Sequence, residues 1–207
     1  MKKILNSIGL VLMAQATLCF VQPNMVQAAP TAKPAENEVP VVEENVDGKT
    51  FSVSRTIVHA HPEAVWQVLT DYSGAPAVFP MLKKCQVLED HGTTKVVKHR
   101  VAPSGLVGQF EYTVEIKETP CKSMEWHRVA GDFKEVDGYW KLEPLDGGRN
   151  TLVTYSSHVN GGMFMPAMLI KRQSRIDMPN VMASLRHQAE TIGNNTIAGR
   201  PSTSHLQ

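Results

Sequence analysis

The sequence lacks an excess of charge of either sign, since 21 Lys and Arg stand against 20 Asp and Glu in 207 residues, for a formal net charge of +1. Proteins that hold nucleic acid by its phosphates need a basic surface, so we expect no nucleic-acid partner. Hydrophobic residues make up 42% of the chain and charged residues 20%, which is ordinary for a globular protein. The length is enough for one domain with a substantial core.

The common signatures of catalysis and metal binding are also missing. No Ser/His/Asp order, phosphate-binding glycine loop or pair of acids stands out in the sequence. His59 and His61 could be two ligands of a metal site, but no third ligand follows at a convincing spacing. We therefore expect no metal and no cofactor, and we assign no catalytic residue. If the protein is an enzyme, its candidate residues are His99, Tyr112 and Arg128.

The first 28 residues are typical of a signal peptide. Two lysines start the chain, an apolar run follows, and small residues up to Ala28 lie where a signal peptidase cleaves. A membrane-spanning helix needs about 20 mostly apolar residues, whereas Asn6, Ser7 and Gln15 interrupt this run. We expect cleavage after Ala28 and export to the periplasm or the extracellular space. The alternative is a membrane anchor formed by the uncleaved segment.

Three regions follow the predicted signal peptide. Residues 29–48 are rich in proline, alanine and glutamate, with one lysine against five acidic residues, and we expect a disordered acidic linker because such a segment cannot build a core. Residues 49–192 carry the alternating patterns of a folded domain. Residues 193–207 are polar and are expected to form a flexible tail.

Strand and helix patterns alternate through the domain in a definite order. A strand at 51–58 leads into two short helices, and Pro62 begins the first of them, where its missing N–H has no partner. A long amphipathic helix ends the domain, and we expect Pro179 to kink or restart it. Between them, the period-two pattern of antiparallel strands with one wet face occurs at 84–90, 94–101, 106–117, 123–129, 134–142 and 151–159.

These elements predict an α+β fold of the helix-grip type. A seven-stranded curved antiparallel sheet wraps around the long C-terminal helix, and two short helices follow the first strand. The apolar stripe of the last helix packs against the concave face of the sheet, and a cavity can remain between them.

Three blocks of residues carry a family resemblance: Ala60–Trp66 with Asp71 and Tyr72, Gly131–Phe133 with Gly138–Pro144, and Pro179 with Leu185 and Glu190. They resemble the START-like, or SRPBCC, superfamily, which shares its fold with the birch pollen allergen. The closest similarity is to the polyketide cyclase/dehydrase and coenzyme Q-binding branch. His61 departs from the family's usual small polar helix cap. The resemblance implies a hydrophobic-ligand pocket and, in some relatives, cyclase or dehydratase chemistry.

The inward face of the predicted sheet and the methionines of the last helix supply the candidate ligand-binding residues. Mostly apolar walls with a few polar groups are typical of small-molecule pockets, although the same side chains could fill a core. Inward-facing His99 and Arg128 favour a pocket, because an unpaired buried charge is costly; the alternative is pairing with an acid or a place at the sheet rim. We expect Arg128 to orient the polar head of a ligand. The predicted set is Val97, His99, Phe110, Tyr112, Val114, Met124, Trp126, Arg128, Trp140, Tyr155, Met168, Met178 and Met182.

Cys85 and Cys121 are expected to be free thiols. An oxidising compartment invites a disulfide, but two predicted strands lie between the strands that carry these cysteines. Three strand spacings of about 4.8 Å come to roughly 14 Å. A disulfide needs Cα atoms within about 7 Å of each other.

We interpret the sequence as an exported protein that binds or carries a hydrophobic small molecule. A lipid, an isoprenoid quinone or a polyketide-like compound would each fit, and we expect a transient contact with a membrane. One alternative is a cyclase or dehydratase that uses the same cavity, and whether any catalysis occurs stays open. A second alternative is a protein-interaction module.

Overall fold

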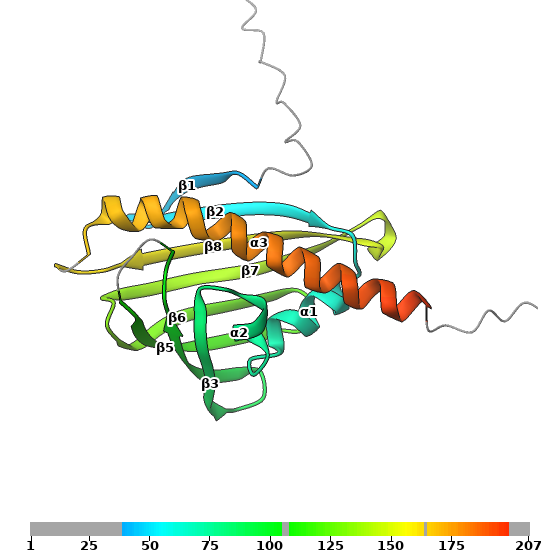
Figure 1. The fold of residues 1–207 in the computed structure, drawn as a ribbon, viewed down its shortest axis with the longest axis horizontal. Helices are drawn as coiled ribbons and strands as arrows, with labels where there is room; N and C mark the ends of the chain where they lie inside the picture. Colours follow the sequence, from blue (N-terminus) through cyan, green and yellow to red (C-terminus); the bar gives the residue numbers. More distant parts are fainter. Residues whose placement is uncertain (1–38, 105–107, 164, 199–207) are drawn as a thin grey trace, which may run out of the picture. The chain divides into compact units, whose positions relative to one another are not determined.

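The computed structural model describes residues 39–104, 108–163 and 165–198. Its fold is α+β, with a curved antiparallel sheet, two short helices and a long C-terminal helix, which confirms the predicted fold class (Figure 1). The predicted signal peptide lies outside the described residues. Within the described residues, no helix is both long enough and apolar enough to span a membrane.

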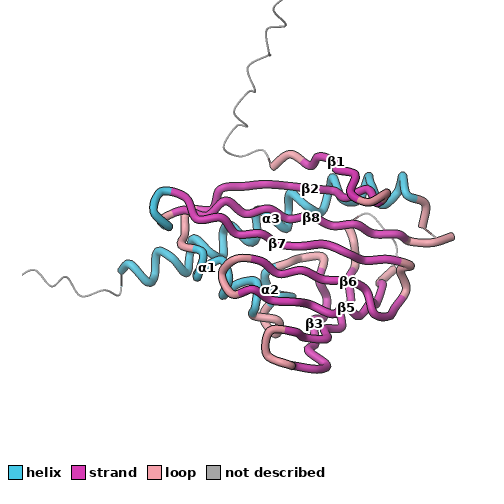
Figure 2. The backbone as a smooth tube through the Cα atoms, turned by 180° about the vertical axis from the view of Figure 1, so that it is seen from behind, coloured by secondary structure: helices cyan, strands magenta, loops and turns pink. Residues whose placement is uncertain are grey.

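Eight strands form the sheet, one more than the sequence patterns predicted. Their order is β1-β2-β8-β7-β6-β5-β4-β3, so each strand from β3 to β8 lies beside the next one in the chain. Figure 2 shows the sheet from the side opposite to α3. The strands are β1 (Val41–Val46), β2 (Lys49–Val58), β3 (Leu82–Asp90), β4 (Thr94–Val101), β5 (Phe110–Thr119), β6 (Ser123–Gly131), β7 (Glu135–Leu145) and β8 (Asn150–Asn160).

Short turns fix the register of the sheet. Between β3 and β4, the Asp90 carboxylate accepts a hydrogen bond from the Gly92 N–H at 2.9 Å, and Gly92 has a φ of 78°. Between β7 and β8, the chain reverses in a 3-10 turn at Asp146–Gly148. Turns this short join neighbouring antiparallel strands.

Two short helices, α1 (Pro62–Thr70) and α2 (Ala75–Val78), close one end of the sheet. Val65 and Val68 of α1 are buried in the core, as the helical spacing predicts. The Asp71 carboxylate links the two helices, because it accepts hydrogen bonds from the Gly74 N–H and the Ser73 hydroxyl at 2.9 Å each. The bond from Gly74 is the main reason why the pKa of Asp71 is lowered.

The long helix α3 (Ala167–Ala198) lies across the concave face of the sheet (Figure 1). Met182, Leu185 and Ala189 follow at spacings of three and four residues and are completely buried, so the predicted apolar stripe is correct over this part of the helix. The helix continues through Pro179 as one element, so the expectation of a restart there is wrong. Residues 193–198 are helical, so the predicted tail begins too early.

The segment Val41–Val46 forms β1 at the edge of the sheet, so the prediction of a disordered linker as far as Gly48 is wrong here. β1 pairs with β2 along its whole length, and the Ser54 hydroxyl donates a hydrogen bond to the Pro40 carbonyl at 3.0 Å. An edge strand needs backbone partners on one side only, and charged side chains are common there. An acidic segment without large apolar residues can therefore pair without adding to a core.

The acidic side chains of β1 face basic side chains of β2 and α3. A guanidinium nitrogen of Arg55 lies 2.9 Å from a Glu44 carboxylate oxygen, and Lys171 Nζ lies 2.7 Å from a Glu43 oxygen. These ion pairs are exposed, and each contributes about 0–1 kcal/mol. Backbone pairing with β2 therefore contributes most of the attachment of β1.

Removal of β1 should destabilise the domain. A chain that starts at Lys49 loses the backbone hydrogen bonds along one strand edge, each worth about 0.5–1.5 kcal/mol net. We expect its Tm to lie several degrees below that of a chain starting at Val39, because 1 kcal/mol corresponds to about 2–4 °C in a domain of this size. Circular dichroism during heating measures the difference, and equal Tm values would show that β1 adds no stability.

The strand order also decides the state of the cysteines. Cys85 lies on β3, and Cys121 lies in the turn between β5 and β6, so β4 and β5 separate the two as the sequence predicts. In the structure both residues are free cysteines. Burial raises the pKa of the Cys85 thiol to about 12, which leaves almost no reactive thiolate at neutral pH.

Thiol titration tests this arrangement. Protein without residues 1–28, denatured and never reduced, should show two reactive thiols per chain, because Cys19 is then absent. In the native protein Cys85 should react slowly, since its thiol is protonated and partly buried. A peptide linking Cys85 to Cys121 in a non-reducing digest would contradict the strand order.

Candidate ligand cavity

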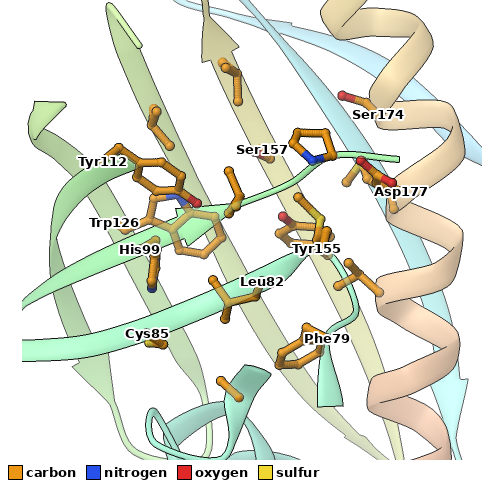
Figure 3. A pocket seen from close by; sticks show the side chains of 18 of the residues that line it. Phe79, Leu82, Cys85, His99, Tyr112, Trp126, Tyr155, Ser157, Ser174 and Asp177 are labelled. Atoms are coloured by element: carbon orange, nitrogen blue, oxygen red, sulfur yellow. The ribbon is translucent and has the colours of Figure 1, made fainter. Parts of the chain in front are cut away.

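A cavity of about 230 Å³ lies between the concave face of the sheet, the α1–α2 segment and the first half of α3. Figure 3 shows side chains from β3, β4, β5, β6 and β8 that converge on it, with α3 along one side. Most of the lining is apolar or aromatic. Such a lining with a few polar groups is what small-molecule sites have in common.

Three aromatic side chains form one wall of the cavity. Trp140 stacks on Tyr155 with ring centroids 4.1 Å apart and an interplanar angle of 12°, and Trp126 lies against the same tyrosine at 6.1 Å. Gly138 is the cross-strand partner of Trp126, and a Cβ at Gly138 would collide with the indole ring. The glycine in β7 therefore leaves the space in which the Trp126 ring lies.

His99 and Cys85 lie side by side on neighbouring strands at another wall (Figure 3). The His99 ring meets the Tyr112 ring edge to face, with centroids 5.2 Å apart. Burial lowers the pKa of His99 to about 4 and raises the pKa of Cys85 to about 12. Both groups are therefore uncharged near pH 7. His99 Nδ1 is buried and has no hydrogen-bond partner among the described residues.

The tyrosine hydroxyls near the cavity are also un-ionised at neutral pH. Burial raises the pKa of Tyr112, and it raises the pKa of Tyr155 to about 12. Burial and then a hydrogen bond to Glu118, 2.5 Å from the Tyr72 hydroxyl to the carboxylate, raise the pKa of Tyr72. These hydroxyls can exchange hydrogen bonds with a ligand, but they carry no charge.

A polar stripe on α3 lines the opposite side of the cavity (Figure 3). Asp177 is 6% exposed, and its carboxyl group accepts hydrogen bonds from the Ser104 N–H at 3.3 Å and from the Gln173 amide at 2.8 Å. Ser174 on α3 and Ser157 on β8 also line the cavity. Both carboxyl oxygens of Asp177 thus have protein partners, whereas His99 Nδ1 has none among the residues that the structure describes.

The structure places about half of the predicted ligand-binding residues on the cavity. Val97, Val114 and Met182 are completely buried in the core instead, and Phe110 packs against Phe133 with centroids 5.4 Å apart. Met168 is 82% exposed, so its prediction as a cavity residue is wrong. The predicted residues that do line the cavity are His99, Tyr112, Met124, Trp126, Trp140, Tyr155 and Met178.

Arg128 does not line the cavity, which corrects the expectation that it orients a ligand's polar head. Its guanidinium donates a hydrogen bond to the Gly131 carbonyl at 2.9 Å. A bulge interrupts the β5–β6 pairing beside Arg128, because Val129 is extra between two successive pairs. Alternation assigned Arg128 to the inner face correctly, but it could not show where a long side chain would end.

The polar part of the lining was not predicted from the sequence. Gln173, Ser174 and Asp177 share one helix face with Ile170, Met178 and Val181, at spacings of three and four residues. Only Met178 of this face was predicted from the sequence, as part of an apolar stripe. The segment Phe79–Leu82 after α2 was missed as well, because it has no periodic pattern.

His59 and a cluster of acids with His158 lie outside the cavity. His59, considered as a metal ligand from the sequence, has its Nδ1 3.1 Å from the Asn150 amide oxygen. Glu135, Asp137 and His158 lie close together on β7 and β8, but Lys49 Nζ already lies 2.6 Å from Asp137 and 3.3 Å from Glu135. The hydrogen bond from Lys49 is the main cause of the lowered pKa of Glu135. We interpret this cluster as ion pairs.

Solved structures with the same fold come from several bacteria. A STAR-related lipid transfer protein from Xanthomonas axonopodis has 19% identity and a TM-score of 0.62, over 76% of this chain and 96% of that one. A START superfamily protein from Mycobacterium smegmatis has 17% identity and a TM-score of 0.60, over 69% and 98%. The Zhui aromatase/cyclase from a Streptomyces species has 16% identity and a TM-score of 0.57, over 75% and 98%. At these identities the likeness shows the fold.

The sequence itself shows the family. Comparison with curated proteins gives no match. Residues 58–186, more than half of the chain, match the family described as "Polyketide cyclase / dehydrase and lipid transport". Together with the helix-grip fold and the apolar cavity, this match shows that the chain belongs to that family, within the START-like superfamily that its sequence blocks resemble.

Proposed function

We propose that the protein binds an apolar small molecule in this cavity and carries it, rather than transforming it. The observation that supports this proposal is the mostly apolar and aromatic lining, in which burial keeps His99 neutral. A ligand that enters such a cavity gains free energy mainly by removing apolar surface from water. The neutral polar groups then orient it.

The ionisation states favour carriage over a cyclase or dehydratase reaction. An effective general base has a pKa near the working pH, whereas His99 has a pKa of about 4. An effective nucleophilic cysteine has a lowered pKa, whereas the pKa of Cys85 is about 12. Neither residue has a pKa suited to proton abstraction or nucleophilic attack at pH 7.

The size of the cavity limits the cargo. Small-molecule sites usually measure about 300–1,000 Å³, and this one holds about 230 Å³. A compact aromatic compound fits within that volume. A lipid or an isoprenoid quinone would place one end there and leave the rest outside. We therefore infer that the cavity recognises a small compound or one end of a longer molecule.

A quinone probe tests binding through Trp126 and Trp140, which both line the cavity, whereas Trp66 lies on α1. In a Trp66→Phe variant, 2-methyl-1,4-naphthoquinone should quench the remaining fluorescence with saturation, because a bound quinone touches both indole rings. Adding Trp126→Phe should reduce the quenchable signal without abolishing saturation. Quenching that only rises linearly with quinone concentration would contradict binding, and conversion of the probe would favour the enzyme.

We also propose that the protein acts after export, with the transient membrane contact that lipid loading requires. The composition of residues 1–28 supports this proposal. Expressed in a bacterium with a periplasm, the protein should appear in the periplasmic or extracellular fraction. Its mass should be that of a chain that starts at Ala29. Full-length protein that stays in the membrane fraction would favour an uncleaved anchor instead.

A further inference from the structure

The buried imidazole of His99 indicates which class of ligand the cavity binds. Its Nδ1 is buried without a hydrogen-bond partner in the described residues, and the ring lines the cavity. An unpaired buried polar atom costs free energy that a hydrogen bond recovers. Elsewhere in the lining, both Asp177 oxygens are already paired with protein donors. A ligand polar atom that reaches His99 Nδ1 would thus supply a hydrogen bond that no described residue supplies.

The chemistry of that polar atom follows from the neutral state of the ring. A neutral imidazole has one nitrogen that donates and one that accepts. A hydroxyl group both donates and accepts, so it can pair with Nδ1 in either tautomer. A charged ligand group gains little there, because burial keeps the ring neutral.

The rest of the lining argues against an anionic ligand. Among the lining residues that the structure describes, none is Lys or Arg. The carboxyl group of Asp177 lies on the opposite wall. A ligand carboxylate buried here would lose its water without gaining a cation, which is costly. Fatty acids in their ionised form are therefore poor candidates.

We propose that the cavity selects neutral apolar alcohols or phenols, whose hydroxyl group hydrogen bonds to His99 Nδ1, over hydrocarbons and carboxylates of similar size. This inference rests on the proposed binding function and adds the class of ligand to it. His99 is a specificity-determining residue under this proposal, and the aromatic wall of Trp126, Trp140 and Tyr155 holds the apolar body of the ligand.

Calorimetric titration of the whole protein at pH 7 with three probes tests the proposal. The probes are 4-propylphenol, butylbenzene with the same number of non-hydrogen atoms, and 4-ethylbenzoate as the anion. The affinity ratio of 4-propylphenol to butylbenzene should fall by about tenfold in His99→Phe, the size expected when a buried hydrogen bond is lost. A general change of the cavity affects both probes and cancels in the ratio, and His99→Leu serves if His99→Phe does not fold.

Tyr155→Phe is the matched control, because it removes another hydroxyl from the same cavity. It should change the ratio by less than about twofold, since Tyr155 is not the residue with the unpaired atom. A ratio unchanged by His99→Phe would overturn the inference and would mean that Nδ1 is satisfied in another way, for instance by water.

The other outcomes separate this inference from the proposed function. If 4-ethylbenzoate binds the original protein as tightly as 4-propylphenol, the selection against anions is wrong. If none of the three probes binds, including butylbenzene, the proposed apolar-ligand function itself fails. If butylbenzene binds and His99→Phe leaves the phenol preference intact, the binding function stands and only the role of His99 is refuted.

Discussion

The complete burial of one apolar stripe on the second half of α3 is the constraint on which the rest of the structure depends. Met182, Leu185 and Ala189 have no exposed surface, and the helix packs against α1 and β2. Toward the start of the helix, the same face carries Gln173 and Asp177 and borders a cavity. Polar groups cannot pack into an apolar core without loss of free energy. The change of residue type along one helix face therefore separates the packed core from the ligand space.

The sequence predicts the sheet well because side-chain direction in a strand has a strict period of two. Parity alone places His99, Tyr112 and Trp126 on the inner face, and all three line the cavity. Parity gives no information on how far along the face the cavity extends. Val114 has the correct parity and is core, and Arg128 has it and turns to the Gly131 carbonyl. The face on which a side chain lies follows from local strand geometry, whereas its position relative to the cavity depends on the whole sheet.

The strand β1 could not be predicted for a different reason. Its acidic composition indicates a segment that buries little apolar surface, which is correct, since Val42 and Val46 are exposed. Its pairing with β2 depends on backbone hydrogen bonds, which any non-proline residue can form. The same acids place Glu43 beside Lys171 in the first half of α3, the half that lines the cavity. A segment that the sequence predicts to be a disordered linker thus contacts the helix that borders the cavity.

Desolvation determines what this cavity can distinguish. The burial that makes the walls attractive to apolar surface also keeps His99 and Cys85 neutral, so the space around them recognises ligands by shape and by single hydrogen bonds. A site with a buried unpaired polar atom discriminates against a ligand that leaves the atom unpaired more strongly than an apolar wall discriminates by one additional methylene. Because the aromatic wall accepts many apolar bodies, selectivity depends on the few polar atoms of the lining, among which His99 Nδ1 is buried with no partner in the described part of the chain.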